Sequence, residues 1–184
     1  MPYKKSNKRN KRKKGVVIWL TGIPCSGKTT LSRLLKRELD KKYDPVYILD
    51  GDEVRKFFEY DLGYNRADRI HNVKRIAFGA MLLAKCGINV IVANIAPYYE
   101  VRDFIRRHIK NYIQIYLKIS IEEAMRRDKK GRYQKCKEGK MKNFIGWDDS
   151  YDIPRNPDLI VDTGKKTVSE SLREILDYLH KIGI

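Results

Sequence analysis

The chain has 184 residues, of which 42% are apolar and 34% are charged. This length and composition favour one compact globular domain over two domains or a disordered chain. No apolar stretch approaches the roughly 20 residues that a membrane-spanning helix needs, and no apolar segment of a secretory signal follows the basic start. Three scattered cysteines without a C-x-x-C pair argue against a disulfide framework or zinc ribbon and fit a reducing compartment, so we expect a cytoplasmic protein without a membrane partner.

The net charge of +17 is the strongest feature of the composition. Residues 1–14 hold eight lysines and arginines and no acid, which leaves +9 on the rest of the chain. We expect a disordered basic tail over residues 1–14 and a folded domain over residues 15–184. Such a charge suits a polyanionic ligand, but charge alone favours a solvated lysine-rich surface with no binding role.

Hydrophobic periodicity predicts strands and helices that alternate along the chain. The predicted strands are Val16–Leu20, Val46–Leu49, Asn89–Ala93, Ile113–Ile119 and Leu159–Val161. The predicted helices are Lys28–Lys42, Ala67–Lys85, Glu100–Lys110, Ile121–Asp128 and Val168–Ile182. Residues 131–156 are polar and lack clear periodicity. This alternation predicts an α/β fold, with a parallel sheet of about five strands and helices on both faces. Ligands of such folds bind at the carboxyl ends of the strands.

A glycine-rich motif, G-x-x-x-x-G-K-T, lies between the first predicted strand and the first predicted helix. Its glycines let successive backbone N–H groups face one anion, and the helix N-terminus adds partial positive charge. Lys28 is placed to reach the β- and γ-phosphates of ATP, and Thr29 to bind Mg²⁺. The predicted nucleotide-binding residues are Gly22, Ile23, Pro24, Cys25, Ser26, Gly27, Lys28, Thr29 and Thr30.

The residues at the ends of the other predicted strands exclude several classes of P-loop protein. No N-K-x-D-like base-reading motif of a GTPase comes after a strand, and the run Ile91–Ala93 ends in Asn94 rather than in the carboxylate of a switch ATPase. The chain is also too short for a helicase or a transporter ATPase. These exclusions predict a small P-loop kinase.

Two carboxylates, Asp50 and Asp52, flank Gly51 at the end of the second predicted strand. At this position beside the phosphate loop they are suited to Mg²⁺, and Asp52 to the hydroxyl group that attacks the phosphoryl group. Arg55 lies one helical turn further along and is suited to a phosphate of the acceptor.

Six blocks resemble the adenylylsulfate (APS) kinase family. They lie in that family's order at residues 49–55 (L-D-G-D-E-V-R), 61–64 (D-L-G-Y), 68–76 (D-R-I-H-N-V-K-R-I), 95–98 (I-A-P-Y), 127–133 (R-D-K-K-G-R-Y) and 142–151 (K-N-F-I-G-W-D-D-S-Y). The resemblance implies a kinase that transfers the γ-phosphoryl group of ATP to the 3′-hydroxyl of adenosine 5′-phosphosulfate, giving PAPS, and it suggests a homodimer.

The resemblance also implies roles for single residues. Lys28 and Asp52 would be catalytic, Thr29 and Asp52 would hold Mg²⁺, and Arg127 would join the ATP site. Asp52, Arg55, Tyr64, Arg69, Asn72, Ile95, Lys130 and Phe144 would bind the acceptor, with Tyr64 and Phe144 on either side of its adenine and Lys130 on a mobile lid. Tyr64 and Phe144 could instead be core aromatics, and for Trp147 we expect the core.

Departures from the family pattern gather near the acceptor and the lid. Ala96 stands where the family often has serine, Glu53 replaces asparagine, Tyr64 replaces phenylalanine, and Arg132, Ile145 and Trp147 replace leucine, threonine and isoleucine. The acceptor could therefore be a different modified nucleotide, such as a cytidine or phosphoramidate nucleotide. A nucleic-acid-binding protein that grips phosphates with its basic tail is a third, less favoured interpretation.

Overall fold

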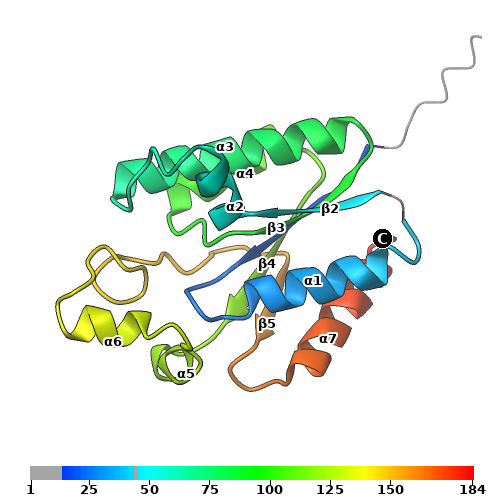
Figure 1. The fold of residues 1–184 in the computed structure, drawn as a ribbon. Helices are drawn as coiled ribbons and strands as arrows, with labels where there is room; N and C mark the ends of the chain where they lie inside the picture. Colours follow the sequence, from blue (N-terminus) through cyan, green and yellow to red (C-terminus); the bar gives the residue numbers. More distant parts are fainter. Residues whose placement is uncertain (1–13, 44) are drawn as a thin grey trace, which may run out of the picture.

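The computed structural model describes residues 14–43 and 45–184. In these residues five strands form one parallel sheet in the order β2-β3-β1-β4-β5 (Figure 1). The strands are β1 (Val17–Thr21), β2 (Val46–Asp50), β3 (Asn89–Ala93), β4 (Tyr112–Lys118) and β5 (Leu159–Asp162). The predicted parallel sheet is confirmed, whereas the predicted tail, apart from Lys14, lies outside the described residues.

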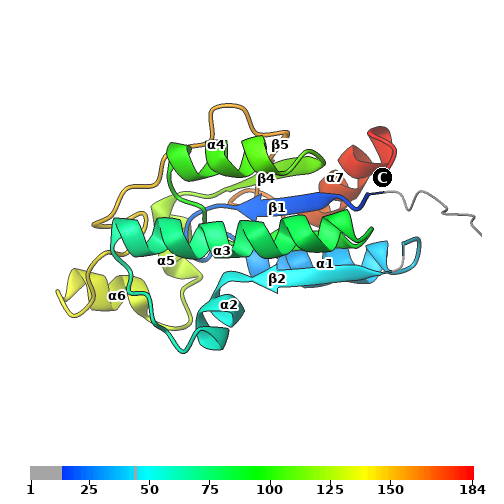
Figure 2. The same cartoon turned by 90° about the horizontal axis from the view of Figure 1, so that it is seen from above.

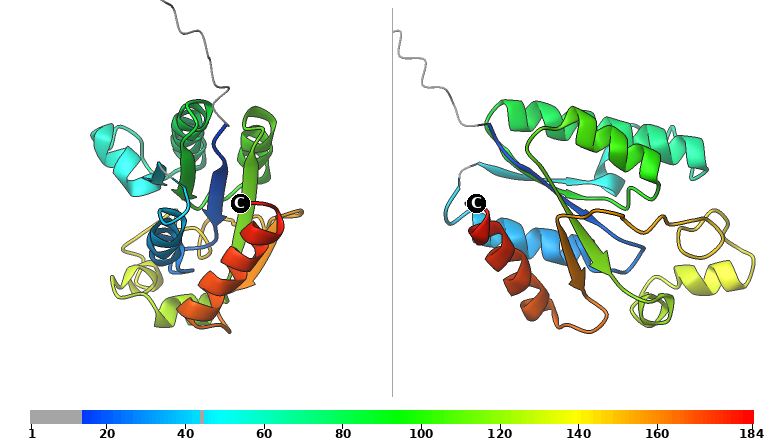
Figure 3. Two further views of the ribbon diagram at one scale, coloured as in Figure 1. Left: turned by 90° about the vertical axis from the view of Figure 1, so that its right-hand side faces the viewer. Right: turned by 180° about the vertical axis from the view of Figure 1, so that it is seen from behind.

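Helices cover both faces of the sheet. On one face lie α3 (Arg66–Lys85) and α4 (Tyr99–His108), side by side, and on the other lie α1 (Lys28–Leu39) and α7 (Val168–Lys181) (Figures 2 and 3). The short helices α2 (Gly51–Phe57), α5 (Ile121–Arg126) and α6 (Arg132–Lys137) lie at or near the carboxyl ends of the strands (Figure 1). None of the described helices is long and apolar enough to cross a membrane.

The central strand β1 shows why the sheet needs two helical layers. All five of its residues are buried. Successive side chains alternate between the faces, so Val17 and Trp19 pack in the cluster with α3 and α4, while Ile18 and Leu20 pack in the cluster with α1 and α7. Burying both faces of one strand removes apolar side chains from water on each side, and this fixes the strand at the centre of the molecule.

The register of the strands brings their carboxyl ends to one edge. Leu20 of β1 pairs with Ala93 of β3, which pairs with Asp50 of β2, while Thr21 pairs with Tyr116 of β4. The loops after β1, β2 and β3 therefore leave the sheet next to one another. This edge is where the predicted ligand site lies.

The structure adds two short helices to the sequence-based prediction and corrects the placement of Trp147. The sequence leaves residues 131–156 unassigned, and there Arg132–Lys137 forms α6, whose Tyr133 and Cys136 are buried. The prediction that Trp147 lies in the core is wrong: it is 43% exposed, because it lies in a tight turn in which its N–H donates to the Phe144 carbonyl. Helix α2 is a separate element that the sequence does not predict, since seven residues carry too little periodicity.

Candidate active site

The phosphate loop joins β1 to α1 and takes its shape from two glycines. A Cβ on Gly22 would lie 2.6 Å from the Leu117 carbonyl oxygen, and Gly27 has a φ of +92° at the N-terminus of α1. Both positions therefore require glycine, one for close approach and one for the left-handed backbone. Cys25 also has a positive φ of 64°, so the backbone curls between the two glycines.

Lys28 turns its ammonium group into this loop. Its Nζ donates to the carbonyl oxygens of Gly22 and Ile23 at 2.8 Å each, and to the Ser26 hydroxyl at 3.3 Å. Removal of the ammonium from water lowers the pKa of Lys28 to about 7, and repulsion from Arg132 acts in the same direction. In the loop the Lys28 ammonium therefore donates to neutral oxygens, with no carboxylate among these hydrogen-bond acceptors.

The acids at the end of β2 differ in what they already bind. The Asp50 carboxylate accepts the Asp52 backbone N–H at 2.9 Å and so caps α2, while Asp52 is exposed at the first turn of that helix. Both acids line the same cleft as Thr29. Carboxylate and hydroxyl oxygens are ligands that suit Mg²⁺, which keeps several waters and needs few protein ligands. The side chains present therefore fit a Mg²⁺ ion brought in with a nucleotide.

The end of the cleft away from the phosphate loop is built around Tyr64. The Arg55 guanidinium donates to the carbonyls of Leu62 and Gly63 at 2.9 Å each and lies 4.6 Å from the centre of the Tyr64 ring. The Arg69 guanidinium lies 5.4 Å from the same ring, which is half exposed. Two guanidinium groups therefore lie near the Tyr64 ring at the cleft. Arg55 also positions the loop that carries Tyr64, through its hydrogen bonds to Leu62 and Gly63.

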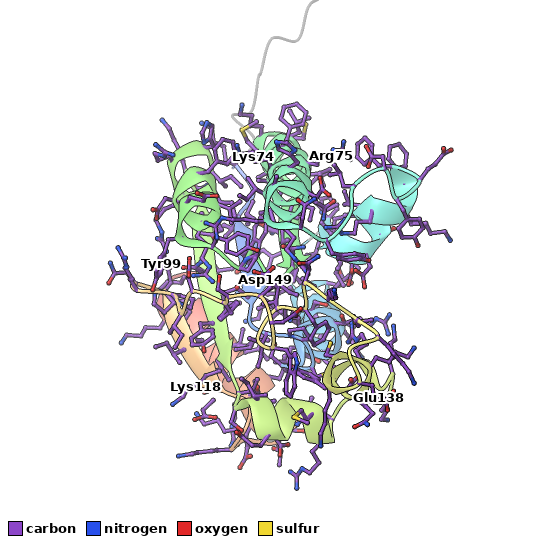
Figure 4. All side chains as sticks on the ribbon, turned by 90° about the vertical axis from the view of Figure 1, so that its left-hand side faces the viewer. Lys74, Arg75, Tyr99, Lys118, Glu138 and Asp149 are labelled. Atoms are coloured by element: carbon purple, nitrogen blue, oxygen red, sulfur yellow. The ribbon has the colours of Figure 1, made fainter. Side chains whose placement is uncertain are left out.

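Arg69 also joins α3 to residues 130–149, which we call the lid segment. It donates to the carbonyls of Tyr64 and Asn143 and lies 3.4 Å from the Asp149 carboxylate, which accepts the Tyr98 hydroxyl at 2.9 Å. Burial lowers the pKa of Arg69, while burial and the bond to Asp149 raise the pKa of Tyr98 to about 12. Figure 4 looks onto this end of the sheet, with Asp149 near the centre of the view.

The lid segment packs against the phosphate loop through aromatic rings. Tyr133 of α6 is buried, packs edge to face against Phe144 with ring centres 4.8 Å apart, and donates its hydroxyl to the Pro24 carbonyl at 3.5 Å. Phe144 is buried too, at 7% exposure, so in this conformation its ring is covered more than that of Tyr64. The mobility expected for the lid stays a prediction.

One cleft of about 1310 Å³ unites these parts. Of the predicted site residues, those that line it are Pro24, Cys25, Ser26, Gly27, Lys28, Thr29, Thr30, Asp52, Arg55, Tyr64, Arg69, Asn72, Ile95, Arg127, Lys130 and Phe144. Gly22 and Ile23 are not among its lining residues and instead support Lys28 from behind. Among the departures from the family pattern, Tyr64, Arg132 and Ile145 line the cleft, whereas Glu53, Ala96 and Trp147 do not.

Sequence reasoning missed one residue that holds the phosphate loop. Thr163, just after β5, is buried, and its hydroxyl lies 3.1 Å from the Ser26 carbonyl and 3.0 Å from that of Lys118, while its own carbonyl accepts from Arg127. Its place directly after a strand was the available signal, because strand ends carry the ligand site in this architecture.

The sheet order, the phosphate loop after β1 and the cleft that runs from it to a set of arginines define a P-loop kinase, an ATP-dependent phosphotransferase. The family model for adenylylsulphate kinase matches residues 14–162. The chain belongs to this family. It is 41% identical to a probable adenylyl-sulfate kinase of Aeropyrum pernix, over 86% of this chain and 89% of that protein.

Two further comparisons extend this likeness. The chain is 41% identical to a probable bifunctional SAT/APS kinase of Sorangium cellulosum, over 92% of this chain but only 29% of that longer protein. The structure resembles that of the Mycobacterium tuberculosis APS kinase in complex with AMPPNP and APS, with a TM-score of 0.85 and 35% identity, over 91% of this chain and 98% of that one.

Proposed function

We propose that this protein transfers the γ-phosphoryl group of ATP to the 3′-hydroxyl of APS, giving ADP and PAPS. The observation that carries the proposal is the single cleft in which the phosphate loop, Asp52 and the arginine-flanked Tyr64 lie together. A donor and an acceptor bound in one cleft are held for direct transfer, which depends on positioning and neutralisation of charge. The sequence and structural likeness to APS kinases supports this choice of acceptor.

In this proposal the phosphate loop and Lys28 bind the phosphates of ATP. The backbone N–H groups of residues 25–29 at the N-terminus of α1 supply donors, and the Lys28 ammonium moves from the loop carbonyls to the phosphate oxygens. Arg127, which borders the cleft beside Thr163, joins the nucleotide site.

Asp52 and Thr29 serve the reacting groups. Asp52 accepts or orients the proton of the attacking 3′-hydroxyl, and with Thr29 it would hold Mg²⁺. The Mg²⁺ ion would neutralise charge on the phosphate oxygens when it is bound.

The acceptor lies at the other end of the cleft. Tyr64 and Phe144 contact its base, and Arg69 and Arg55 contribute positive charge. The Asn72 side-chain oxygen is buried without a partner among the described residues, which suits it to accept a hydrogen bond from the nucleotide. Ile95 lines the cleft between the two ends, and Lys130 adds a cation from the lid.

The assembly and the location of the protein belong to the same proposal. A homodimer in the cytoplasm, with residues 15–184 as one kinase domain, agrees with the family resemblance. Sedimentation equilibrium measures the mass in solution, and a monomer at micromolar concentration would refute the dimer.

The decisive experiment measures ATP-dependent phosphorylation of APS, AMP and CMP-type or phosphoramidate nucleotides under equal conditions with Mg²⁺. We expect APS to be the preferred acceptor, and Asp52→Ala to abolish the reaction. Asp177→Asn removes a carboxylate from the exposed side of α7 and should leave the rate unchanged.

The other outcomes separate the alternatives. If another nucleotide is phosphorylated while APS is ignored, the kinase chemistry stands and the acceptor is wrong, with Tyr64, Ile145 and Arg132 as the departures that line the cleft. If no nucleotide is phosphorylated, the proposed function fails. Salt-dependent RNA binding that is lost on removal of residues 1–14 would then favour the nucleic-acid-binding interpretation.

A further inference from the structure

Arg132 is a basic residue of the cleft for which the family resemblance gives no role, because leucine is typical of that position in the resembled motif. It begins α6 and borders the cleft. One terminal nitrogen of its guanidinium lies 3.8 Å from the sulfur of Cys25, in the middle of the phosphate loop. Helix α6 therefore brings a cation to the phosphate loop.

Neighbouring contacts set the position of Arg132 closely. The buried Asp128 carboxylate accepts the Lys130 and Tyr133 backbone N–H groups at 3.2 and 2.8 Å, which fixes the turn into α6. Tyr133, the next residue along, contacts the Pro24 carbonyl of the phosphate loop through its hydroxyl. Arg132 thus starts from a turn that Asp128 fixes and that Tyr133 joins to the phosphate loop, so its guanidinium needs little reordering to meet a ligand there.

Arg132 forms an ion pair with Asp128, but the contact is long and is not a hydrogen bond. Its Nε is buried and makes no hydrogen bond, and the Asp128 oxygen 3.8 Å away already accepts a backbone N–H. Arg132 thus brings to the phosphate loop a guanidinium whose buried Nε lacks a hydrogen-bond acceptor among the described residues, and a phosphate oxygen would supply one.

We propose that Arg132 is a second phosphate-binding residue of the donor site, which contacts the phosphate chain of ATP across the loop from Lys28. The inference rests on the proposed function, because it takes ATP as the occupant of the loop. The donor is favoured over the acceptor because a terminal nitrogen of the guanidinium lies 3.8 Å from Cys25, inside the phosphate-binding motif, whereas the guanidinium carbon lies 5.8 Å from the centre of the Phe144 ring. A planar guanidinium can bind two phosphate oxygens at once, which the leucine of the resembled motif cannot do.

The test measures the affinity for one nucleotide at a time by calorimetry. The full-length protein and the variants Arg132→Leu, Arg132→Lys and Lys135→Leu are titrated separately with AMPPNP, with AMP and with APS. Lys135 is the matched control, because it is an exposed lysine of the same helix that does not line the cleft. Thermal unfolding of each variant checks that α6 and the loop keep their packing.

We expect Arg132→Leu to weaken AMPPNP about 10-fold or more, because a charge-assisted contact to phosphate is lost. Arg132→Lys should restore part of this affinity, and Lys135→Leu should change it less than about 2-fold. AMP, which lacks the β- and γ-phosphates, should bind the Arg132→Leu variant nearly as well as it binds the original protein.

Three results would overturn the inference. Equal weakening of AMPPNP and AMP would mean that Arg132 merely attaches α6 to the loop. Unchanged AMPPNP affinity, or weakened binding of APS in place of AMPPNP, would place no donor phosphate at Arg132. Failure of the proposed function is a separate result. If AMPPNP binding depends on Arg132 but the protein does not phosphorylate APS, the role of Arg132 stands and APS is not the acceptor.

Discussion

The two ends of the cleft are built in different ways. The donor end is one contiguous segment, residues 22–29, whose shape depends on β1, α1 and two glycines. The acceptor end collects Arg55, Tyr64, Arg69 and Phe144 from α2, the loop after it, α3 and the lid segment. A site made from backbone N–H groups depends on one local conformation, whereas a site made from side chains depends on how distant segments pack.

This difference predicts unequal responses to substitution. Changes at the donor end should abolish transfer to every acceptor, because all of them need the same phosphates to be bound. Changes at the acceptor end should be graded and should alter one substrate at a time. Three substitutions and one proton measurement test that contrast, from the largest expected effect to the smallest.

The largest effect is expected for Lys28→Met, which keeps the length of the side chain and removes its charge. We expect kcat for APS phosphorylation to fall about 100- to 1,000-fold, because the charge that develops on the transferred phosphoryl group loses the lysine of the phosphate loop. Steady-state kinetics measure this loss, with Lys135→Met as the control on α6. A loss smaller than about 10-fold would show that other groups carry the donor charge.

At the acceptor end, Arg69→Met should lower kcat/KM for APS about 10- to 100-fold, because Arg69 supplies charge and also ties Tyr64 to the 143–149 segment. The KM for ATP should change less than about 2-fold. Arg107→Met, on the exposed side of α4, is the matched control. An equal rise of the KM for ATP would contradict the separation of the two ends.

Thr163→Val should destabilise the support of the phosphate loop. The buried hydroxyl lies within hydrogen-bond distance of the carbonyls of Ser26 and Lys118. The variant removes this donor at nearly constant volume, and the Lys118 carbonyl keeps the Gly164 N–H. We expect the free energy of unfolding to fall by about 1–2 kcal/mol, measured by urea denaturation. An unchanged denaturation midpoint would show that the hydroxyl contributes nothing to the loop.

The smallest expected effect is the uptake of a proton when a nucleotide binds. Since the pKa of Lys28 is lowered to about 7 in the free loop, much of this group is neutral at pH 8. Bound phosphates favour the charged form and raise that pKa, so binding at pH 8 should take up as much as about one proton, and affinity should fall as the pH rises above 7. Calorimetry in buffers with different ionisation enthalpies measures the uptake. Lys28→Met should abolish it, and proton release by the original protein would contradict the sign.

The sequence by itself determined the alternation of strands and helices and the place of the phosphate loop. Apolar runs such as that of β1 keep their period in any packing, and the motif of residues 22–29 acts through its own backbone. These signals are local, so they can be read from the sequence without knowledge of the fold. The sheet and the loop were therefore predictable, and the resemblance in six blocks extended the prediction to the acceptor.

Only the tertiary structure decided which side chains meet. It placed Thr163 beneath the loop, left Trp147 exposed, buried Phe144 against Tyr133 and brought Arg132 to Cys25. Cys25 and Arg132 are more than 100 residues apart, and their approach depends on how a six-residue helix packs on a distant loop. Contacts of this kind are sums of many weak packing and electrostatic terms, and no periodicity in the chain encodes them.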